Sequence, residues 1–335
     1  MPDAPDTAGT AAPLRVVVLG AGGIGGYFGG VLARAGQDVT LLARGEHLAA
    51  IQAHGLELRT PAEEAGATTA ARVRVRATSD PAALPDADLV LVAVKSYSLH
   101  EVAPAAARLA ARGATVLPLL NGVDAADRLA EAGVPRAALL GGVTVISAAR
   151  VAPGVVERRS AFQRVVVGRF AAAAAPPADD PLGDRRVADI VRAFHDAGVE
   201  ARVSPRIDVE LWNKLAFLAS MAAACGLARQ DVGTVRRAPL GRLLIERAVA
   251  EIAAVGRAHG VALDPDVTAQ TVAAIDALPD AMRPSFLLDL AHGGPTELDV
   301  LSGAVGRLGR QYGVPTPVHD TAVAALGAAT NVVAP

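Results

Sequence analysis

VVVLGAGGIGGYFGG, at residues 16–30, decides the fold of this chain. An apolar run is followed at once by a glycine-rich turn and then by a segment that can form a helix. The turn contains the pattern G-x-G-x-x-G. Its first glycine makes the tight turn, its second lets backbone approach a pyrophosphate, and its third lets helix and strand pack closely. We therefore predict a dinucleotide-binding turn, with Gly20, Ala21, Gly22, Gly23, Ile24 and Gly25 as cofactor-binding residues.

Apolar runs alternate with helical segments beyond this turn. The expected strands are residues 14–19, 39–43, 89–94, 115–120, 164–167 and 199–203, and the expected helices include residues 24–35 and 185–197. Continuous apolar runs are typical of parallel strands that are buried on both faces. The alternation predicts an α/β fold with a Rossmann-type, doubly wound parallel sheet.

Strand signals end near residue 205, and long helical patterns follow. The expected helices are residues 206–229, 239–259, 265–277, 281–291 and 295–312. We expect a disordered lead at 1–13, a cofactor-binding Rossmann domain at 14–205, and an all-helical substrate and catalytic domain at 206–330. The segment AAAAAPPADDPLGD, at residues 171–184, is typical of a loop.

Charge and composition exclude several classes of protein. The 335 residues carry a net charge of −2, so no strongly basic field is present to hold nucleic acid or an anionic membrane. The start of the chain lacks the basic-then-apolar layout of a secretory signal, so we expect a cytoplasmic protein. The 7 histidines have no paired ligand spacing, and no metal is expected. The single cysteine, Cys225, has no histidine near it in sequence and is not expected to act as a nucleophile.

Arg44 narrows the choice of cofactor. NAD enzymes of this fold usually place Asp or Glu about 20 residues after the turn, where it bonds the ribose 2′-hydroxyl. Here the second strand ends in Leu41-Leu42-Ala43-Arg44. A guanidinium group suits a 2′-phosphate, so we favour NADP over NAD. The alternative is a solvated loop arginine.

Lys214 stands out because the chain has only 2 lysines, Lys95 and Lys214, against 30 arginines. Lys214 belongs to a predicted helix that Asp208 could cap, and it lies above an apolar stripe. Partial desolvation there lowers the pKa of an ammonium group, and such a lysine can protonate a carbonyl oxygen. The alternative is a surface lysine whose ammonium group reaches solvent.

A second group of polar residues lies at PSFLLDLAHGGPTELD, residues 284–299. Ser285 and Asp289 share one face of a predicted helix. Gly293-Gly294-Pro295 breaks the chain, and we expect Pro295 to begin a new helix with Glu297 in its first turn. Favourable placement against the helix dipole is the alternative explanation of Glu297.

Together these segments resemble the ketopantoate reductase (2-dehydropantoate 2-reductase) family over residues 14–317. The matching pieces are the glycine turn, LLARGEHLAAIQAHGLEL, VAVKSY, LLNGV, ELWNKLAF and PTELD. Their order and spacing are far more specific than the glycine motif alone.

The resemblance implies a role for each matching residue. Lys214 would donate a proton to the substrate carbonyl, and Glu297 would orient the lysine and the bound cofactor or substrate. Asn121 would lie where cofactor and substrate meet, and Lys95 near the NADP phosphates. The resemblance also implies that Ala148 offers backbone to the cofactor and that Ser285 helps to hold the substrate carboxylate. It implies NADPH-dependent reduction of ketopantoate to pantoate, and it makes a homodimer one expectation.

The chain departs from the family pattern on the lysine helix. Family members usually carry asparagines four and eight residues after the lysine, where they bind the substrate's polar groups. Here those positions are Leu218 and Ala222. This favours a bulkier or less polar 2-keto acid or lactone as an alternative substrate. A non-catalytic NADP-binding regulatory protein is a third hypothesis. It is disfavoured because the chain retains Lys214, Asn121 and Glu297 together, none of which such a protein needs.

Overall fold

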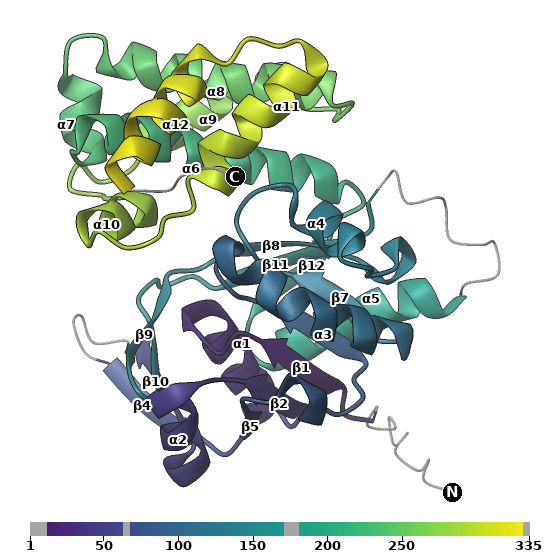
Figure 1. Ribbon diagram of the computed structural model, residues 1–335. Helices are drawn as coiled ribbons and strands as arrows, with labels where there is room; N and C mark the ends of the chain where they lie inside the picture. Colours follow the sequence, from purple (N-terminus) through teal and green to yellow (C-terminus); the bar gives the residue numbers. More distant parts are fainter. Residues whose placement is uncertain (1–11, 63–67, 171–180, 331–335) are drawn as a thin grey trace, which may run out of the picture.

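The chain forms an α/β part followed by a helical part (Figure 1), seen in a computed structural model that describes residues 12–62, 68–170 and 181–330. Almost all of the predicted disordered lead, and most of the predicted loop at 171–184, fall outside these residues. The predicted loop was drawn too long, because a helix begins at Pro181.

The central sheet confirms the predicted parallel fold. Its strands are β1 (Arg15–Leu19), β2 (Asp38–Leu42), β5 (Arg76–Thr78), β6 (Leu89–Val92) and β7 (Thr115–Pro118). They lie in the order β5-β2-β1-β6-β7, and every pair is parallel. The helices of this region are α1 (Gly23–Arg34), α2 (Gly45–His54), α3 (Leu99–Ala111) and α4 (Ala125–Glu131), with short 3-10 turns η1 (Pro81–Ala83), η2 (Ser96–Ser98) and η3 (Arg136–Ala138). The carboxyl ends of β1, β2 and β6 therefore meet at one edge, where ligands bind in open α/β sheets.

Two smaller sheets accompany the central one. One has the order β4-β3-β10-β9, built from β3 (Leu56–Pro61), β4 (Thr68–Val73), β9 (Ala148–Ala152) and β10 (Val155–Arg158). The other has the order β12-β11-β8, built from β8 (Gly141–Val145), β11 (Arg164–Gly168) and β12 (Glu200–Val203), with α5 (Pro181–Asp196) connecting the last two.

These small sheets correct the expected single sheet. The predicted strands at 164–167 and 199–203 do form and pair in parallel, but in a separate sheet, where β12 and the antiparallel β8 occupy the two edges of β11. The sequence did not predict β3, β4, β5, β8, β9 or β10. Most of the missed strands are short or partly exposed, so they lack the continuous apolar runs of buried parallel strands.

The part of the chain described after residue 206 contains helices and no strand. They are α6 (Ile207–Ala228), α7 (Val232–Arg237), α8 (Gly241–Ala258), α9 (Val267–Asp276), α10 (Ser285–Ala291), the π-helix η4 (Asp299–Gly303), α11 (Ala304–Tyr312) and α12 (Pro317–Thr330). Helices α7 and α12 were not predicted. Two local predictions were wrong. Arg206 rather than Asp208 occupies the N-cap of α6. Pro295 begins no helix, so Glu297 lies in an irregular turn just before η4.

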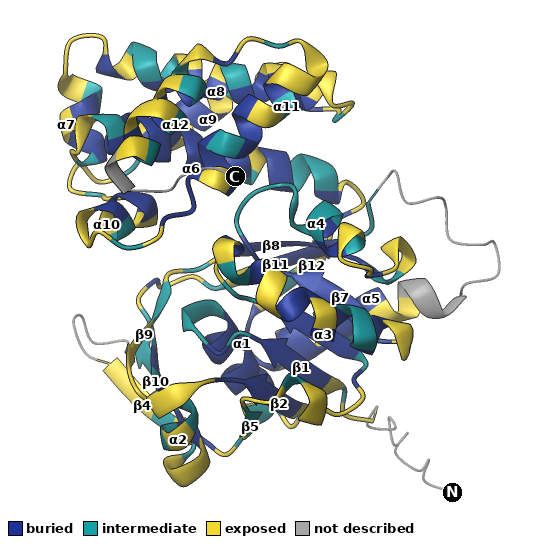
Figure 2. Ribbon diagram, in the orientation of Figure 1, coloured by how far each residue is buried: buried dark blue, intermediate teal, exposed yellow. Residues whose placement is uncertain are grey.

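Helix α6 is the core of the helical part and its link to the sheets (Figure 2). It is long and apolar enough to cross a membrane, but 67% of its most apolar window is buried inside the protein. Its first residue, Ile207, fits against β8 because Gly141 has no side chain. A Cβ at Gly141 would lie 2.5 Å from Ile207 Cγ1. The glycine therefore lets the helix that carries Lys214 dock closely on the α/β part.

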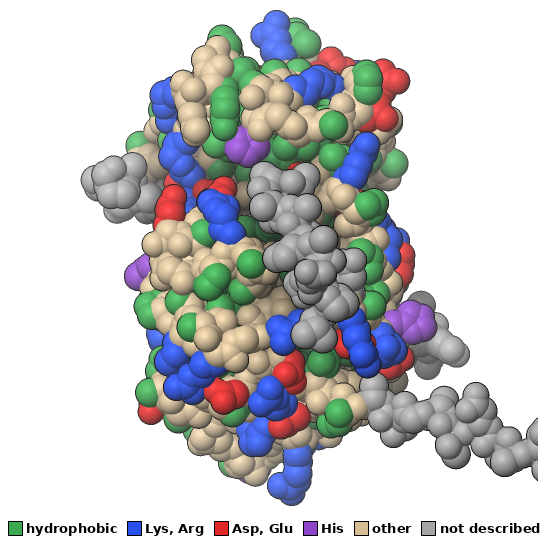
Figure 3. All heavy atoms as spheres, turned by 90° about the vertical axis from the view of Figure 1, so that its right-hand side faces the viewer, with side chains coloured by type: hydrophobic (Ala, Val, Ile, Leu, Met, Phe, Trp, Pro, Cys, Tyr) green, Lys and Arg blue, Asp and Glu red, His purple; other side chains and the backbone are tan. Residues whose placement is uncertain are grey.

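Charged side chains of both signs are interleaved on the face shown in Figure 3. Elsewhere on the surface, exposed ion pairs include Arg15 with Asp88 and Arg164 with Glu200. Such exposed pairs contribute little to stability, because water and salt screen them.

Candidate active site

The glycine turn has the geometry that its sequence predicts. Gly20 has φ +105°, which favours glycine, and it brings the chain sharply out of β1. A Cβ at Gly25 would lie 2.0 Å from the carbonyl oxygen of Gly20, so this position demands close packing. A Cβ at Gly22 would meet nothing within 4 Å. The turn is thus closely packed at Gly25 and open at Gly22. A bound pyrophosphate at the N-terminus of α1 would require this arrangement.

Two elements from elsewhere in the chain support this turn. The backbone of Ala148, at the start of β9, passes so close to Gly23 that a Cβ there would lie 2.3 Å from the Ala148 carbonyl oxygen. His47, on α2, contacts the turn through Nε2, which lies 2.8 Å from the Ala21 carbonyl oxygen. The backbone N–H of Gly154 donates to His47 Nδ1 at 2.9 Å. His47 therefore connects the glycine turn to the β9–β10 hairpin.

His47 is neutral in this arrangement. Since Nδ1 accepts from Gly154, the ring proton must lie on Nε2, from which it donates to Ala21. The residue is 4% exposed, and burial lowers the pKa of its imidazole. Protonation of Nδ1 would set a donor against a donor, so this contact holds only for the uncharged ring.

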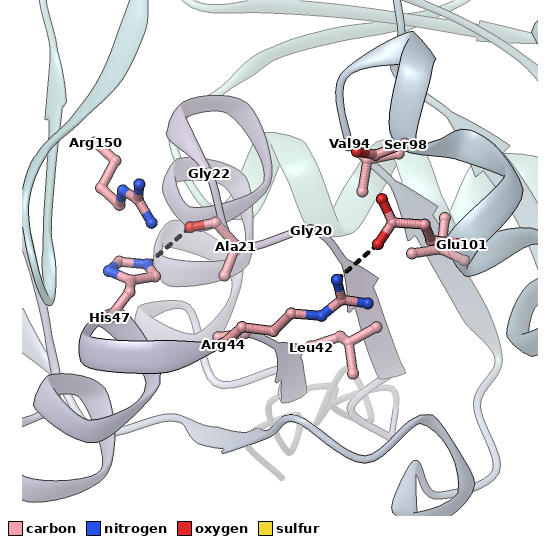
Figure 4. Close-up of a pocket in the computed structure, with 12 residues that line it drawn as sticks. Gly20, Ala21, Gly22, Leu42, Arg44, His47, Val94, Ser98, Glu101 and Arg150 are labelled. Atoms are coloured by element: carbon pink, nitrogen blue, oxygen red, sulfur yellow. Dashed lines mark hydrogen bonds and ion pairs between the residues drawn. The ribbon is translucent and has the colours of Figure 1, made fainter.

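A pocket of about 210 Å³ opens in front of the turn, between the ends of β2 and β6 (Figure 4). Its lining residues are Gly20, Ala21, Gly22, Leu42, Ala43, Arg44, His47, Val94, Ser98, Glu101, Val102 and Arg150. Arg44 reaches across it, and its Nη1 donates to Glu101 Oε2 at 2.6 Å. This hydrogen bond lowers the pKa of the Glu101 carboxyl. The predicted cofactor residue Arg44 thus lies at the predicted turn, but in an ion pair.

A second polar cluster forms around Glu297, which is 6% exposed. Asn121, in the loop after β7, donates from Nδ2 to Glu297 Oε2 at 3.1 Å. Lys95, at the start of η2, lies 3.4 Å from the same oxygen and 3.0 Å from Asp289 Oδ2. Burial works to lower the pKa of Lys95, but the charges of Glu297 and Asp289 outweigh it and raise the pKa. Residues of both parts of the chain therefore meet at one carboxylate.

Lys214 lies in the field of this carboxylate. Its side chain is partly buried on α6, and burial lowers its pKa to about 8, against the opposing effect of Glu297. Within the part of the chain that the structure describes, no hydrogen bond holds its ammonium group. A lysine with these properties can release a proton near neutral pH.

Four charged side chains link the two parts beside this cluster. Arg128 of α4 binds Asp124 and, at 2.6 Å, Asp299 of η4. Arg307 of α11 binds Asp299 and, at 2.9 Å, Asp124. We call these four residues the ion-pair ring. Nearby, a Cβ at Gly122 would lie 2.9 Å from the Val300 carbonyl oxygen, so the loop after Asn121 packs directly on η4.

Other predicted positions lie on α6 and α10. Leu218 is partly buried, whereas Ala222 is 2% exposed within the helical core. Ser285 is exposed on α10, one turn before Asp289. Cys225 is fully buried, and burial raises its pKa to about 12, so its thiol is poorly nucleophilic. Among the described side chains, no group of three or more His, Cys, Asp or Glu residues is placed to hold a metal ion.

The structure adds residues that the sequence did not single out. Asp289 had been noted only for its spacing from Ser285, and its contact with Lys95 was unforeseen. Glu101 and Arg150 carry no local signal, because their place in the pocket depends on tertiary structure. His47 lies three residues after Arg44 in a segment that had been quoted, but nothing in the sequence indicates that it is buried.

Comparison with known proteins agrees with this architecture. The family model "Ketopantoate reductase PanE/ApbA" matches residues 16–172. The model for the C-terminal part of the same family matches residues 206–330. The chain belongs to the ketopantoate reductase family and is an oxidoreductase of that family. A 2-dehydropantoate 2-reductase of Halobacterium salinarum is 38% identical over 311 residues, covering 92% of this chain and 96% of the relative. The uncharacterized oxidoreductase YkpB of Bacillus subtilis is 28% identical over 315 residues, covering 93% and 98%.

Solved structures show the same fold. A PanE/ApbA family ketopantoate reductase from Ralstonia eutropha JMP134 has a TM-score of 0.82 at 31% identity, covering 94% of this chain and 98% of its own. A D-mandelate dehydrogenase solved with NADH and anilino(oxo)acetate has a TM-score of 0.80 at 22% identity, covering 94% and 98%. At that identity the likeness concerns the fold alone.

Proposed function

We propose that this protein reduces the 2-keto group of a 2-keto acid with NADPH, and that its substrate is 2-dehydropantoate. The product would be pantoate, on the way to pantothenate and coenzyme A. The single observation that carries the proposal is Lys214, a partly buried lysine on α6 that interacts electrostatically with Glu297; burial lowers its pKa to about 8, against the opposing charge of Glu297. The 38% identical 2-dehydropantoate 2-reductase supports the choice of substrate.

The pocket in front of the glycine turn fits a dinucleotide. Gly22 leaves room for a pyrophosphate at the N-terminus of α1, and Arg44 lies where a 2′-phosphate would follow the second strand. Ala148 supplies backbone beside the turn, and Lys95 and Asn121 lie farther along, next to Glu297. Bound NADPH would supply the hydride.

Lys214 would supply the proton. Negative charge develops on the carbonyl oxygen as the hydride arrives, and an ammonium group placed there stabilises that charge before giving up its proton. Glu297 would keep the ammonium group of Lys214 oriented. The hydrogen bond from Asn121 to Glu297 would hold these two side chains where cofactor and substrate meet. Ser285, on α10, would bind the substrate carboxylate.

A bulkier or less polar 2-keto acid, or a lactone, is the second candidate. Leu218 and Ala222 replace the asparagines expected there, and apolar side chains cannot make the same hydrogen bonds. Of the two, only Leu218 is partly exposed, so Leu218 carries most of this argument.

Steady-state kinetics with a panel of 2-keto acids and lactones, using NADPH and NADH, tests both candidates. We expect the highest kcat/KM for ketopantoate with NADPH. A larger kcat/KM for an aromatic or branched keto acid would favour the second candidate. No turnover with any substrate would favour a non-catalytic NADP-binding regulatory protein.

The division into a cofactor domain at 14–205 and a substrate domain at 206–330 belongs to this proposal. So do a cytoplasmic location and a homodimer. Cofactor binding by an isolated fragment, fractionation of cells and light scattering would test these three points respectively.

A further inference from the structure

Three charged side chains line the pocket in front of the glycine turn: Arg44, Arg150 and Glu101 (Figure 4). His47 adds no charge, because both of its ring nitrogens are committed as an uncharged imidazole. Arg44 and Glu101 form an ion pair at 2.6 Å, so their charges largely cancel. Arg150 is therefore the uncompensated charge of the pocket.

Arg150 comes from β9, in a different sheet from the glycine turn. Its side chain is exposed, and none of the described residues forms a hydrogen bond or ion pair with it. Figure 4 shows its guanidinium group turned toward Ala21 and His47. It thus faces the same side of the pocket as the end of β2 and the first turn of α2, which begins at Gly45.

This side of the pocket is where a ribose 2′-substituent belongs. In the Rossmann arrangement, the residues that follow the second strand contact the adenosine ribose. The free backbone N–H groups of the α2 N-terminus also favour an anion there. A phosphate at this position would be within the reach of Arg44 from one side and Arg150 from the other.

Glu101 works in the opposite direction. A 2′-phosphate that binds Arg44 has to compete with a carboxylate that already holds the same guanidinium group. It would also lie near a charge of its own sign. A free 2′-hydroxyl meets neither obstacle.

We infer that Arg150 is a cofactor-binding residue that selects for the 2′-phosphate, and that Glu101 is a specificity-determining residue that limits this selection by holding Arg44. The inference rests on the proposed use of NADPH and adds the source of its selectivity. Arg150 supplies most of the preference for NADPH, while Glu101 keeps NADH usable.

Binding of 2′,5′-ADP and 5′-AMP, measured by calorimetry on the full chain, isolates the 2′-phosphate from the reaction. In Arg150→Gln we expect affinity for 2′,5′-ADP to fall about tenfold or more, as for a lost hydrogen bond to a charged group, with little change for 5′-AMP. In Glu101→Gln we expect 2′,5′-ADP to bind about two to five times more tightly. In each variant, the affinity for NADPH should change as that for 2′,5′-ADP does, and the affinity for NADH should change as that for 5′-AMP does.

Arg159→Gln is the matched control, because it removes one positive charge outside the pocket from an exposed pair with Glu157. It should leave both affinities unchanged, and thermal melting of all three variants checks that each is folded. Equal effects of Arg150→Gln on both nucleotides, or no effect on either, would overturn the assignment of Arg150. Weaker binding of 2′,5′-ADP by Glu101→Gln would overturn the competition.

These outcomes are separable from failure of the proposed reaction. Selective loss of 2′,5′-ADP binding in Arg150→Gln, with no reduction of any keto acid by the wild type, would leave this inference standing and remove the enzyme function. A wild type that binds 5′-AMP as tightly as 2′,5′-ADP would overturn this inference and leave reduction with NADH open.

Discussion

Asn121 donates a hydrogen bond to Glu297 across 176 residues of sequence, at 3.1 Å. The amide comes from the loop after a strand of the central sheet, and the carboxylate comes from the turn before η4 in the helical part. Lys95 approaches the same oxygen, and the charge of Glu297 reaches Lys214. The buried carboxylate of Glu297 therefore interacts with polar groups from both halves of the chain.

Lys214→Ala should abolish most turnover without abolishing cofactor binding. Loss of a general acid typically costs 10²–10⁴-fold in rate, so we expect kcat to fall by about that factor. Cofactor affinity should change little in a fluorescence titration. Lys214→Met is a useful companion, because it removes a charge that is costly to bury and should not lower the melting temperature at pH 7. Normal turnover in either variant would contradict the assignment of the proton donor.

The kcat/KM for reduction should fall as pH rises through about 8. Lys214 must carry a proton to donate one, and its pKa in the folded protein is about 8. The reverse oxidation should rise over the same range, because it needs the neutral amine. Glu297 opposes the effect of burial, so Glu297→Gln should move this limb of the pH–rate profile to lower pH. A profile that is flat from pH 7 to 9.5 would argue against Lys214.

His47 offers a pair of variants that separate its two contacts. Glutamine places an amide near the position of Nε2 and can still donate to Ala21, whereas asparagine mimics Nδ1 and can still accept from Gly154. Loss of one neutral hydrogen bond is worth about 1 kcal/mol, or roughly fivefold in affinity. We therefore expect His47→Asn to raise the cofactor Kd about fivefold, and His47→Gln to raise it less. Equal Kd values would show that His47 does not act through the turn.

The ion-pair ring should matter for catalysis more than for stability. Asp299→Asn weakens the bonds from Arg128 and Arg307, two residues beyond Glu297. We expect kcat to fall several-fold, because Glu297 loses its fixed position, while cofactor Kd stays near the wild-type value. Asp127→Asn is the control, since Asp127 pairs with Arg136 outside the ring. Loss of cofactor binding in Asp299→Asn would contradict a local role.

The elements that could be predicted are those with strong local signals. The glycine turn, the buried strands of the central sheet and the long helix of Lys214 follow from apolar runs and from spacing, and all form as expected. The beginning of η4 could not be predicted. Pro295 is a common first residue of a helix, yet the chain stays irregular there while Glu297 turns toward Asn121 and Lys95.

The candidate site was predicted as a set of residue types rather than as contacts. Lys214 stood out because lysines are so rare in this chain, and Glu297 was noted after the break at Gly293-Gly294-Pro295. The family resemblance supplied Asn121 and the role of Glu297. The pairing of Arg44 with Glu101 and that of Lys95 with Asp289 join residues that are 57 and 194 positions apart. No periodicity within one segment reports on such pairs, because they depend on how separate elements pack.

The glycine turn leans on parts of the chain that lie more than a hundred residues away. Ala148 packs against Gly23, and Gly154 anchors His47 beneath the Ala21 carbonyl. A chimera that contained only the first strand, turn and helix in another scaffold would have the glycines but would lack the contacts from Ala148 and His47. The motif is therefore not a portable module in this protein, and transplanting its nucleotide affinity would require moving the β9–β10 hairpin as well.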